Sequence, residues 1–284
     1  MATVVYVLLG VLVLLIIAYI FVPKAMLRFA EKNLIFQPPV PRAWQMQYGQ
    51  GNMQEYMVDV RNNGKDYRIH TIFAPAALQR CNQNVLYCHG NASDLNDQQH
   101  IVEFYHDKGI NVLLWDYSGY GKSSGTPSYE MVKKGVLAVF DWFKKNFDSK
   151  NVIVHGMSLG GAAAAYLAAH RPVSGLILES TFNSVASALT KGKRYTFFDE
   201  FCNDKCLGKL SNKVPVLIIH SYDDDVISVQ NSHQLYNRLM RNKERSKSNT
   251  AFIGVHGGNH FNAKYSAEFW PEFDYLFGCP LFKE

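Results

Sequence analysis

A single serine lies between glycines at a point where branched apolar residues give way to small ones. The stretch HGMSLGG occupies residues 155–161, after the apolar residues 152–154 and before the four alanines at 162–165. Branched apolar residues favour a buried strand, and a helix rich in alanine can pack closely on a sheet. Glycines two positions before and after the serine leave room for strand and helix to cross around a tight turn. The stretch therefore predicts a strand, a sharp turn at Ser158 and a helix.

Short apolar runs alternate with helical patterns along the chain after residue 38. An opening antiparallel hairpin is expected at residues 54–60 and 67–73, around the turn Asn62-Asn63-Gly64. Six further strands are expected at residues 84–88, 110–115, 152–155, 175–178, 214–219 and 250–255, and helices at 97–108, 129–147, 161–170, 229–245 and 261–276. This alternation is typical of helices that cover a parallel sheet. It predicts an α/β fold with an eight-stranded, mostly parallel sheet and helices on both faces, in one domain over residues 39–284.

Residues 182–213 show no strand pattern and carry Lys191, Lys193 and Arg194 near several phenylalanines. We interpret this interval as an amphipathic helix packed on the sheet. A small lid, or a surface that touches a membrane, is the alternative.

A continuous apolar segment at residues 4–22 is long enough, at about 1.5 Å per residue, to cross a hydrocarbon core of about 30 Å. A cleaved signal peptide is the alternative, but no Lys or Arg precedes the segment and no A-x-A site follows it. We therefore predict a retained transmembrane helix in an anchor and juxtamembrane segment, residues 1–38. Lys24, Arg28 and Lys32 all follow the span, which predicts a single-pass membrane protein with a cytosolic C-terminal domain.

Charge and cysteine content narrow the class further. The formal charge of +5 is spread along the chain without a basic stripe, so no nucleic-acid partner is expected. The five cysteines are dispersed and lack metal-ligand spacing, so most are expected to be buried small hydrophobic residues, in keeping with a cytosolic domain.

A serine hydroxyl becomes a useful nucleophile only when a base removes its proton. Candidate partners for Ser158 follow the last two expected strands, with aspartates at 223–225 and histidines at 256 and 260. His260 is preferred as the base because the glycines at 257 and 258 let the loop return over the sheet edge. His256 is expected to pack or to be solvated. The residue types alone do not distinguish Asp223, Asp224 and Asp225 as the acid.

Four stretches together resemble the α/β-hydrolase-fold serine hydrolases. They are HGNA at residues 89–92, DYSGYGKSSG at 116–125, GMSLGG at 156–161 and ESTFNS at 179–184. The resemblance covers about residues 54–277, and within that superfamily the chain is similar to a small-lid, membrane-anchored group that includes protein depalmitoylases. It implies a triad in the chain order serine, acid, histidine, with Ser158 as nucleophile and His260 as base.

The resemblance also assigns the acid and the oxyanion donors. The pattern H-G-x-x-D-x-x-V-P places the acid at Asp224, although this chain has Ser221, Ile227 and Ser228 where the pattern has glycine, valine and proline. Backbone amides of Asn91 and Leu159 would hold the developing oxyanion. A tight turn without catalytic meaning is the alternative for the HGNA loop.

Two details of these motifs bear on the site. Thr181 stands where relatives usually have proline. Asn91-Ala92-Ser93 is a glycosylation sequon, but a glycan there would obstruct the expected site, which again favours a cytosolic domain.

These features predict acyl transfer to Ser158 with hydrolysis of the acyl-enzyme, and no metal or organic cofactor is implied. The expected substrates are acyl esters or thioesters near a membrane, such as palmitoylated proteins, lysophospholipids or acylglycerols, with membrane lipids as partners. The oligomeric state is not predicted. The rival interpretation is a membrane-tethered binding protein that has lost turnover. Action on peptides or carbon–halogen bonds is a second rival, and the latter usually needs a carboxylate nucleophile in place of Ser158.

Overall fold

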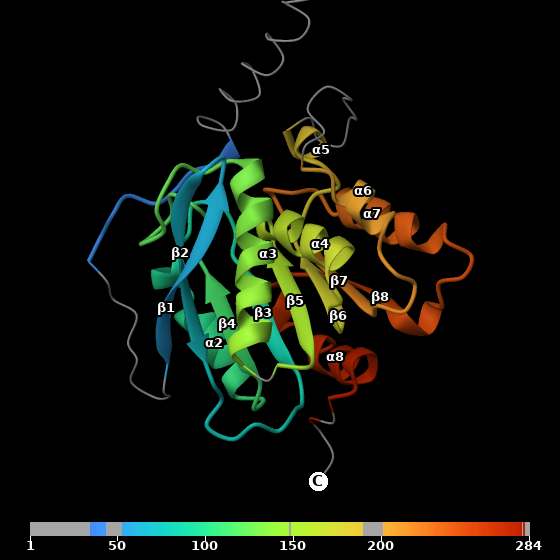
Figure 1. Ribbon diagram of the computed structural model, residues 1–284. Coiled ribbons are helices and arrows are strands. Elements are labelled where there is room, and N and C mark those ends of the chain that lie inside the picture. Colours follow the sequence, from blue (N-terminus) through green and yellow to red (C-terminus); the bar gives the residue numbers. More distant parts are fainter. Residues whose placement is uncertain (1–34, 44–52, 148, 190–200, 280, 282–284) are drawn as a thin grey trace, which may run out of the picture.

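The computed structural model describes residues 35–43, 53–147, 149–189, 201–279 and 281, and its centre is an eight-stranded sheet (Figure 1). The strands are β1 (Gln54–Asn62), β2 (Lys65–Ala74), β3 (Asn84–Cys88), β4 (Asn111–Trp115), β5 (Val152–Met157), β6 (Gly175–Glu179), β7 (Val216–Ser221) and β8 (Thr250–Val255). Their order in the sheet is β1-β2-β4-β3-β5-β6-β7-β8. β1 pairs antiparallel with β2, and β2 with β4, while the other pairs are parallel. The predicted eight-stranded, mostly parallel sheet is confirmed.

The described helices lie on both faces of this sheet, as predicted. They are α2 (Gln99–His106), α3 (Tyr129–Asn146), α4 (Gly160–His170), α5 (Val185–Leu189), α6 (Asn203–Leu207), α7 (Gln230–Met240) and α8 (Phe269–Phe277), with 3₁₀ turns η2 (Leu95–Asp97), η4 (Lys247–Asn249) and η5 (Ala263–Tyr265). Buried side chains of α3, α4, α6 and α7 belong to one hydrophobic cluster, and those of α2 and α8 belong to a second. The parallel strands are buried on both faces because each face has its own layer of helices.

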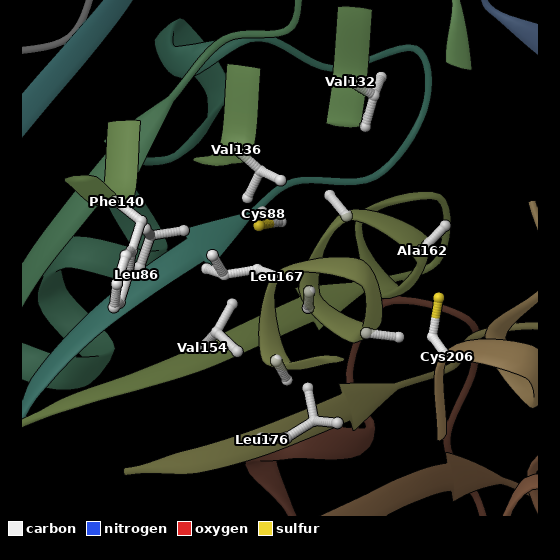
Figure 2. Packing of buried hydrophobic residues seen from close by; sticks show 14 of the residues in the cluster. Leu86, Cys88, Val132, Val136, Phe140, Val154, Ala162, Leu167, Leu176 and Cys206 are labelled. Atoms are coloured by element: carbon white, nitrogen blue, oxygen red, sulfur yellow. The ribbon is translucent and has the colours of Figure 1, made fainter. Parts of the chain in front are cut away.

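Alternate residues of the central strands point to opposite clusters. Leu86 and Cys88 of β3 pack with α3 and α4, whereas Val85 and Tyr87 pack on the α2 and α8 side. Figure 2 shows side chains of β3, β5 and β6 pointing toward α3 and α4. Five of the six alanines of α4 are buried, so this helix lies close against the strands as its composition predicts.

The predicted opening hairpin is confirmed. Asn62 pairs with Lys65, which leaves Asn63 and Gly64 as a two-residue turn with φ values of 50° and 75°. Both residues adopt the left-handed region that such a turn requires.

Several helices differ from the expected bounds. The helix expected at 261–276 begins only at Phe269, after a 3₁₀ turn at Ala263–Tyr265. Pro271 lies in the first turn of α8, and its ring would clash with the carbonyl of residue 267 if the helix began earlier. The helix expected at 229–245 ends at Met240.

In the interval 182–213 the described residues form the two five-residue helices α5 and α6, and residues 190–200 between them are not described, so the expected amphipathic helix stays a prediction. Lys191, Lys193 and Arg194 lie outside the described residues. Phe201 is buried, and its ring centroid is 5.6 Å from that of Phe36.

In the described part of the chain, every helix is too short or too polar to cross a bilayer. The anchor predicted at residues 4–22 lies outside the described residues, as does most of the segment 1–38. Phe36 is only 2% exposed and belongs to the core, so the packed unit includes residues before the expected boundary at 38.

The cysteines divide into two groups. A disulfide joins Cys81, before β3, to Cys279, after α8. Cys88, Cys202 and Cys206 are buried and take no part in the disulfide, as expected for most of the cysteines.

Candidate active site

Ser158 occupies the turn between β5 and α4 with a φ of 54°, in the left-handed region that non-glycine residues rarely adopt. The flanking glycines are required by the close crossing. A Cβ atom on Gly156 would lie 2.3 Å from the Gly160 carbonyl oxygen, and one on Gly160 would lie 1.9 Å from the Cys88 carbonyl oxygen. The sharp strand–turn–helix predicted from the sequence is confirmed.

Neighbouring main chain and one hydroxyl hold the strained residue. The Ser158 amide donates to the carbonyl oxygen of Glu179 at 2.9 Å. Thr181 Oγ1 donates to the Ser158 carbonyl oxygen at 2.7 Å, a bond that a proline at this position could not make. Ser158 is only partly buried, at the carboxyl end of β5.

His260 and Asp224, far apart in the chain, form a hydrogen-bonded pair. His260 Nδ1 lies 2.8 Å from Asp224 Oδ2, and the two side chains are 4% and 0% exposed. Asp224 follows β7 and His260 follows β8, so both lie beyond the carboxyl ends of neighbouring strands. Because Nδ1 faces the carboxylate, the imidazole has Nε2 left for proton transfer.

Asp224 is held ionised by several donors. Its Oδ1 accepts the amides of Val226 at 2.9 Å and Ile227 at 2.8 Å. Burial alone would raise the pKa of Asp224, but hydrogen bonds from His220, His260 and the Ile227 amide keep this pKa well below its ordinary value. A permanent carboxylate can orient the neighbouring imidazole and stabilise its protonated form.

His220 is a partner of the acid that sequence reasoning did not assign. Its Nε2 lies 3.0 Å from Asp224 Oδ2 and 2.7 Å from the Ile227 carbonyl oxygen. A carbonyl only accepts, so Nε2 carries the hydrogen, and the Ser232 hydroxyl at 2.7 Å can donate to Nδ1. A signal for His220 was available, because the pattern H-G-x-x-D-x-x-V-P begins with a histidine at this position.

The competing acids and base take other places. Asp223 accepts the Gly257 amide at 2.7 Å and so fixes the start of the histidine loop. Asp225 is exposed. His256 is exposed and stacks on Tyr222 with ring centroids 4.4 Å apart, as expected for a packing residue.

The amides expected to hold an oxyanion are available. Within the described part of the chain, neither the Asn91 nor the Leu159 amide has a hydrogen-bond acceptor. A Cβ on Gly90 would lie 3.6 Å from Ser158 Cβ, so the loop before Asn91 passes directly beside the serine. The catalytic role of the Asn91 and Leu159 amides remains a prediction.

The Asn91 side chain binds the segment 35–43. Its Nδ2 donates to the Ile35 carbonyl oxygen at 2.5 Å, and its Oδ1 accepts the Gln37 amide at 2.9 Å and the Tyr120 hydroxyl at 2.7 Å. The bond to Ile35 uses the side-chain nitrogen that a glycan would need.

Asp116, the first residue of the DYSGYGKSSG motif, supports the HGNA loop from its buried side. It is fully buried, and its Oδ1 accepts the Leu95 amide at 2.9 Å and lies 3.5 Å from His89 Nε2. Burial alone would raise the pKa of Asp116, but His70 and His89 hold it below its usual value. A Cβ on Gly121 would lie 2.1 Å from Asp116 Oδ2, which explains that glycine of the motif.

Comparisons with known proteins identify relatives of this chain. Residues 79–211 match the family model described as serine aminopeptidase, S33. The chain is 27% identical over 215 residues to the uncharacterized protein YfhR of Salmonella typhimurium, covering 69% of this chain and 71% of that protein. It is 30% identical over 207 residues to lysophosphatidylserine lipase ABHD12 of Mus musculus, covering 64% of this chain and 51%, about half, of that protein.

A solved structure shows the fold. The Pyrococcus furiosus esterase Pf2001 superposes with a TM-score of 0.68 at 17% identity, covering 86% of this chain and 97% of that one. The chain therefore has the α/β-hydrolase fold.

Proposed function

We propose that this chain of the α/β-hydrolase fold is a membrane-associated serine hydrolase that cleaves long-chain acyl esters or thioesters. One observation carries the proposal. A serine in a strained turn lies beside an amide-lined loop, and a buried His–Asp pair with a 2.8 Å contact follows neighbouring strands of the same sheet. This is the set of groups that acyl transfer needs.

In the proposed mechanism, His260 Nε2 takes the proton from the Ser158 hydroxyl as the serine oxygen attacks the acyl carbonyl. The amides of Asn91 and Leu159 stabilise the resulting oxyanion, and Asp224 stabilises the imidazolium. The imidazolium then gives its proton to the leaving alcohol or thiol, which departs and leaves the acyl group on Ser158. Water attacks this acyl-enzyme with His260 again as base, releasing the acid and restoring the serine.

Apolar side chains beside the acid and the base support an acyl substrate. Phe261, next to His260, is 64% exposed, and Val226, close to Asp224, is 57% exposed. Both residues flank the hydrogen-bonded Asp224–His260 pair, and exposed apolar side chains beside a site are available to contact an apolar ligand. ABHD12, whose name is that of a lipase for a lysophospholipid, is also among the relatives.

We further propose a single membrane span at residues 4–22, with Lys24, Arg28 and Lys32 on the cytosolic side as charge asymmetry predicts. The Cys81–Cys279 disulfide favours the opposite side because disulfides persist in oxidising compartments. Protease protection of sealed microsomes distinguishes the two. Digestion of the domain without detergent means a cytosolic domain, and protection until detergent is added means a lumenal one.

The test of the activity uses the full chain in membranes or detergent and its Ser158→Ala variant. A fluorophosphonate probe should label the unmodified chain and not the variant, and turnover of a p-nitrophenyl acyl ester should fall by about 10⁶-fold in the variant. Labelling that survives in Ser158→Ala would mean another nucleophile, and folded protein with neither labelling nor turnover would mean the tethered binding protein.

The substrate class is tested with the same preparation. Lysophosphatidylserine, a monoacylglycerol and a palmitoyl-thioester peptide are compared with an aminoacyl p-nitroanilide, because the matched family model is described as an aminopeptidase. Faster turnover of the acyl lipids or the thioester supports the proposal. Preference for the aminoacyl anilide contradicts it.

A further inference from the structure

Glu179, the last residue of β6, lies between the segments that carry Ser158 and His260. Its side chain is fully buried, and its carbonyl oxygen accepts the Ser158 amide at 2.9 Å. One carboxylate oxygen lies 3.2 Å from Lys264 Nζ, and the other lies 3.1 Å from His155 Nε2. His155 belongs to the strand that ends at the serine, and Lys264 belongs to the loop that follows the base. A single carboxylate thus contacts both halves of the proposed site.

Lys264 ties the loop after His260 to this carboxylate. Its side chain is only 2% exposed, and its Nζ also donates to the Phe261 carbonyl oxygen at 2.8 Å. Its backbone amide donates to the same carboxylate at 3.4 Å. A buried ammonium needs a counter-charge, so the side chain cannot leave Glu179 without a large cost. The peptide after His260 is therefore held by an ion pair that solvent does not screen.

The other side of the carboxylate faces a neutral histidine. Burial lowers the pKa of His155 and so favours its neutral form, with one ring hydrogen. The ionised Glu179 carboxylate, 3.1 Å from Nε2, only accepts, so the ring hydrogen is on Nε2, and Nδ1 accepts the Tyr105 hydroxyl at 2.7 Å. With β5 on one side and the histidine loop on the other, the carboxylate has one position.

We propose that Glu179 and Lys264 are positioning residues that set the place of His260 relative to Ser158. The inference rests on the proposed function, because it assigns to this pair the geometry of that proton transfer. Neither side chain contacts substrate. The pair acts through the main chain, at the Phe261 carbonyl on one side and at the Ser158 amide on the other.

The first experiment replaces the cation with an apolar chain of similar length. Lys264→Met in the full chain should lower kcat for a p-nitrophenyl acyl ester by about 10- to 100-fold and leave KM unchanged, because misplacement of the base by about 1 Å costs on that order. Lys264→Arg, which keeps the charge, should recover part of the loss. Circular dichroism checks that the compared proteins are folded.

A matched control separates positioning from general destabilisation. Arg245 is another cation that is only 5% exposed, and it donates to the Val214 and Ser211 carbonyl oxygens at 3.0 and 2.8 Å, before β7 and away from the site. Arg245→Met should lower thermal stability and leave kcat of the folded protein unchanged. Equal losses of kcat in the two variants would overturn the proposal.

A second experiment asks whether the pair acts through the base. In a His260→Ala background the residual turnover depends on the oxyanion amides and on binding. There Lys264→Met should have no further effect. If it lowers the residual turnover by the same factor as in the unmodified chain, the pair is merely structural and the proposal fails. Wild-type kcat in folded Lys264→Met overturns it as well.

The failure of this inference can be told from failure of the proposed function. Absence of fluorophosphonate labelling in the unmodified chain rejects the function. Normal labelling combined with wild-type kcat in Lys264→Met rejects only the positioning role. Glu179→Gln should lower kcat like Lys264→Met; where it does not fold, the double variant Glu179→Gln/Lys264→Met, which leaves no unpaired charge, takes its place.

Discussion

The two loops that complete the proposed site are held to the domain by different means. The base loop, residues 256–265, is tied to β6 by the buried charges of Glu179 and Lys264. The oxyanion loop, residues 89–93, is tied through Asn91 to the main chain of residues 35 and 37 and to one tyrosine hydroxyl, in partly exposed surroundings. The base loop is attached by a charge pair within the core, whereas Asn91 is held by neutral hydrogen bonds in partly exposed surroundings, and only the start of its loop, His89, faces a buried carboxylate, that of Asp116.

This difference sets how each loop can be disturbed. Removing one member of a buried ion pair costs about 3–5 kcal/mol, whereas a neutral hydrogen bond contributes about 0.5–1.5 kcal/mol. The base loop is therefore fixed wherever the domain is folded. The oxyanion loop depends in addition on the segment 35–43, which overlaps the end of the predicted anchor and juxtamembrane segment, residues 1–38. We infer that proton transfer is the more robust half of the site and oxyanion binding the more adjustable one.

The largest effect is expected when the base itself loses its orientation. Asp224→Asn should lower kcat by about 10⁴-fold, because an amide can hold His260 in the wrong tautomer and cannot stabilise the imidazolium. Steady-state turnover of a p-nitrophenyl ester measures this.

Asp225→Asn is the matched control, since Asp225 is exposed and follows directly in the chain. It should retain full activity. A loss of kcat in Asp225→Asn with little change in Asp224→Asn would identify Asp225 as the acid. The orientation of His260 would then not depend on Asp224.

A smaller effect is expected on the oxyanion side. Asn91→Ala keeps the backbone amide and removes the three side-chain bonds that hold it. We expect kcat to fall by about 10-fold, less than the 10²–10³-fold typical for loss of a whole oxyanion donor. Single-turnover acylation measures the step directly.

Ser93→Ala serves as the control, because it destroys the sequon and leaves the bonds of Asn91 intact. Its activity and its electrophoretic mobility should equal those of the unmodified chain. Wild-type acylation by Asn91→Ala would show that the segment 35–43 does not support the loop, and the contrast between the two loops would disappear.

The fold could be predicted because its strands are short, strongly apolar runs that recur at regular intervals. The predicted β3 and β8 have the observed bounds, and the other strands differ by a few residues at their ends. The helix expected at 261–276 was wrong at its start because an apolar period does not reveal that Lys264 turns inward to a carboxylate. Pro271 was the local signal that the helix could not extend earlier.

For the candidate site, local motifs indicated Ser158, Asp224 and His260, and the structure places two of these in direct contact. The residues that hold the two loops in place were not predicted. Glu179 and Lys264 are 85 residues apart, and Asn91 contacts a residue 56 positions earlier. Taken alone, none of these residues stands out, because Glu179 is a charged residue at a strand end and Lys264 and Asn91 are polar residues in loops. Only the fold brings them to their partners.

The smallest effect is expected on stability in acid, where the two attachments should differ. Burial alone would raise the pKa of Glu179, but Lys264 and His155 lower it from 4.5 to about 2. A carboxyl group with a depressed pKa adds stability that is fully present above its ordinary pKa and is lost as the pH falls through the folded value. The free energy of unfolding in urea should therefore contain a contribution from Glu179 that disappears between pH 4.5 and about pH 2.

The double variant Glu179→Gln/Lys264→Met lacks this contribution. The difference in the free energy of unfolding between the unmodified chain and this variant should therefore shrink across that pH window. Arg42→Ala perturbs a contact of the segment 35–43 next to the oxyanion loop, because Arg42 pairs with Asp94 at 3.2 Å and Asp97 at 2.5 Å while its side chain is 40% exposed. An exposed pair contributes about 0–1 kcal/mol, so this variant should follow the unmodified chain closely at every pH. If the difference in the free energy of unfolding between the unmodified chain and the double variant stays constant down to pH 2, the Glu179 carboxylate is not held by charge. The base loop would then differ from the oxyanion loop only in burial.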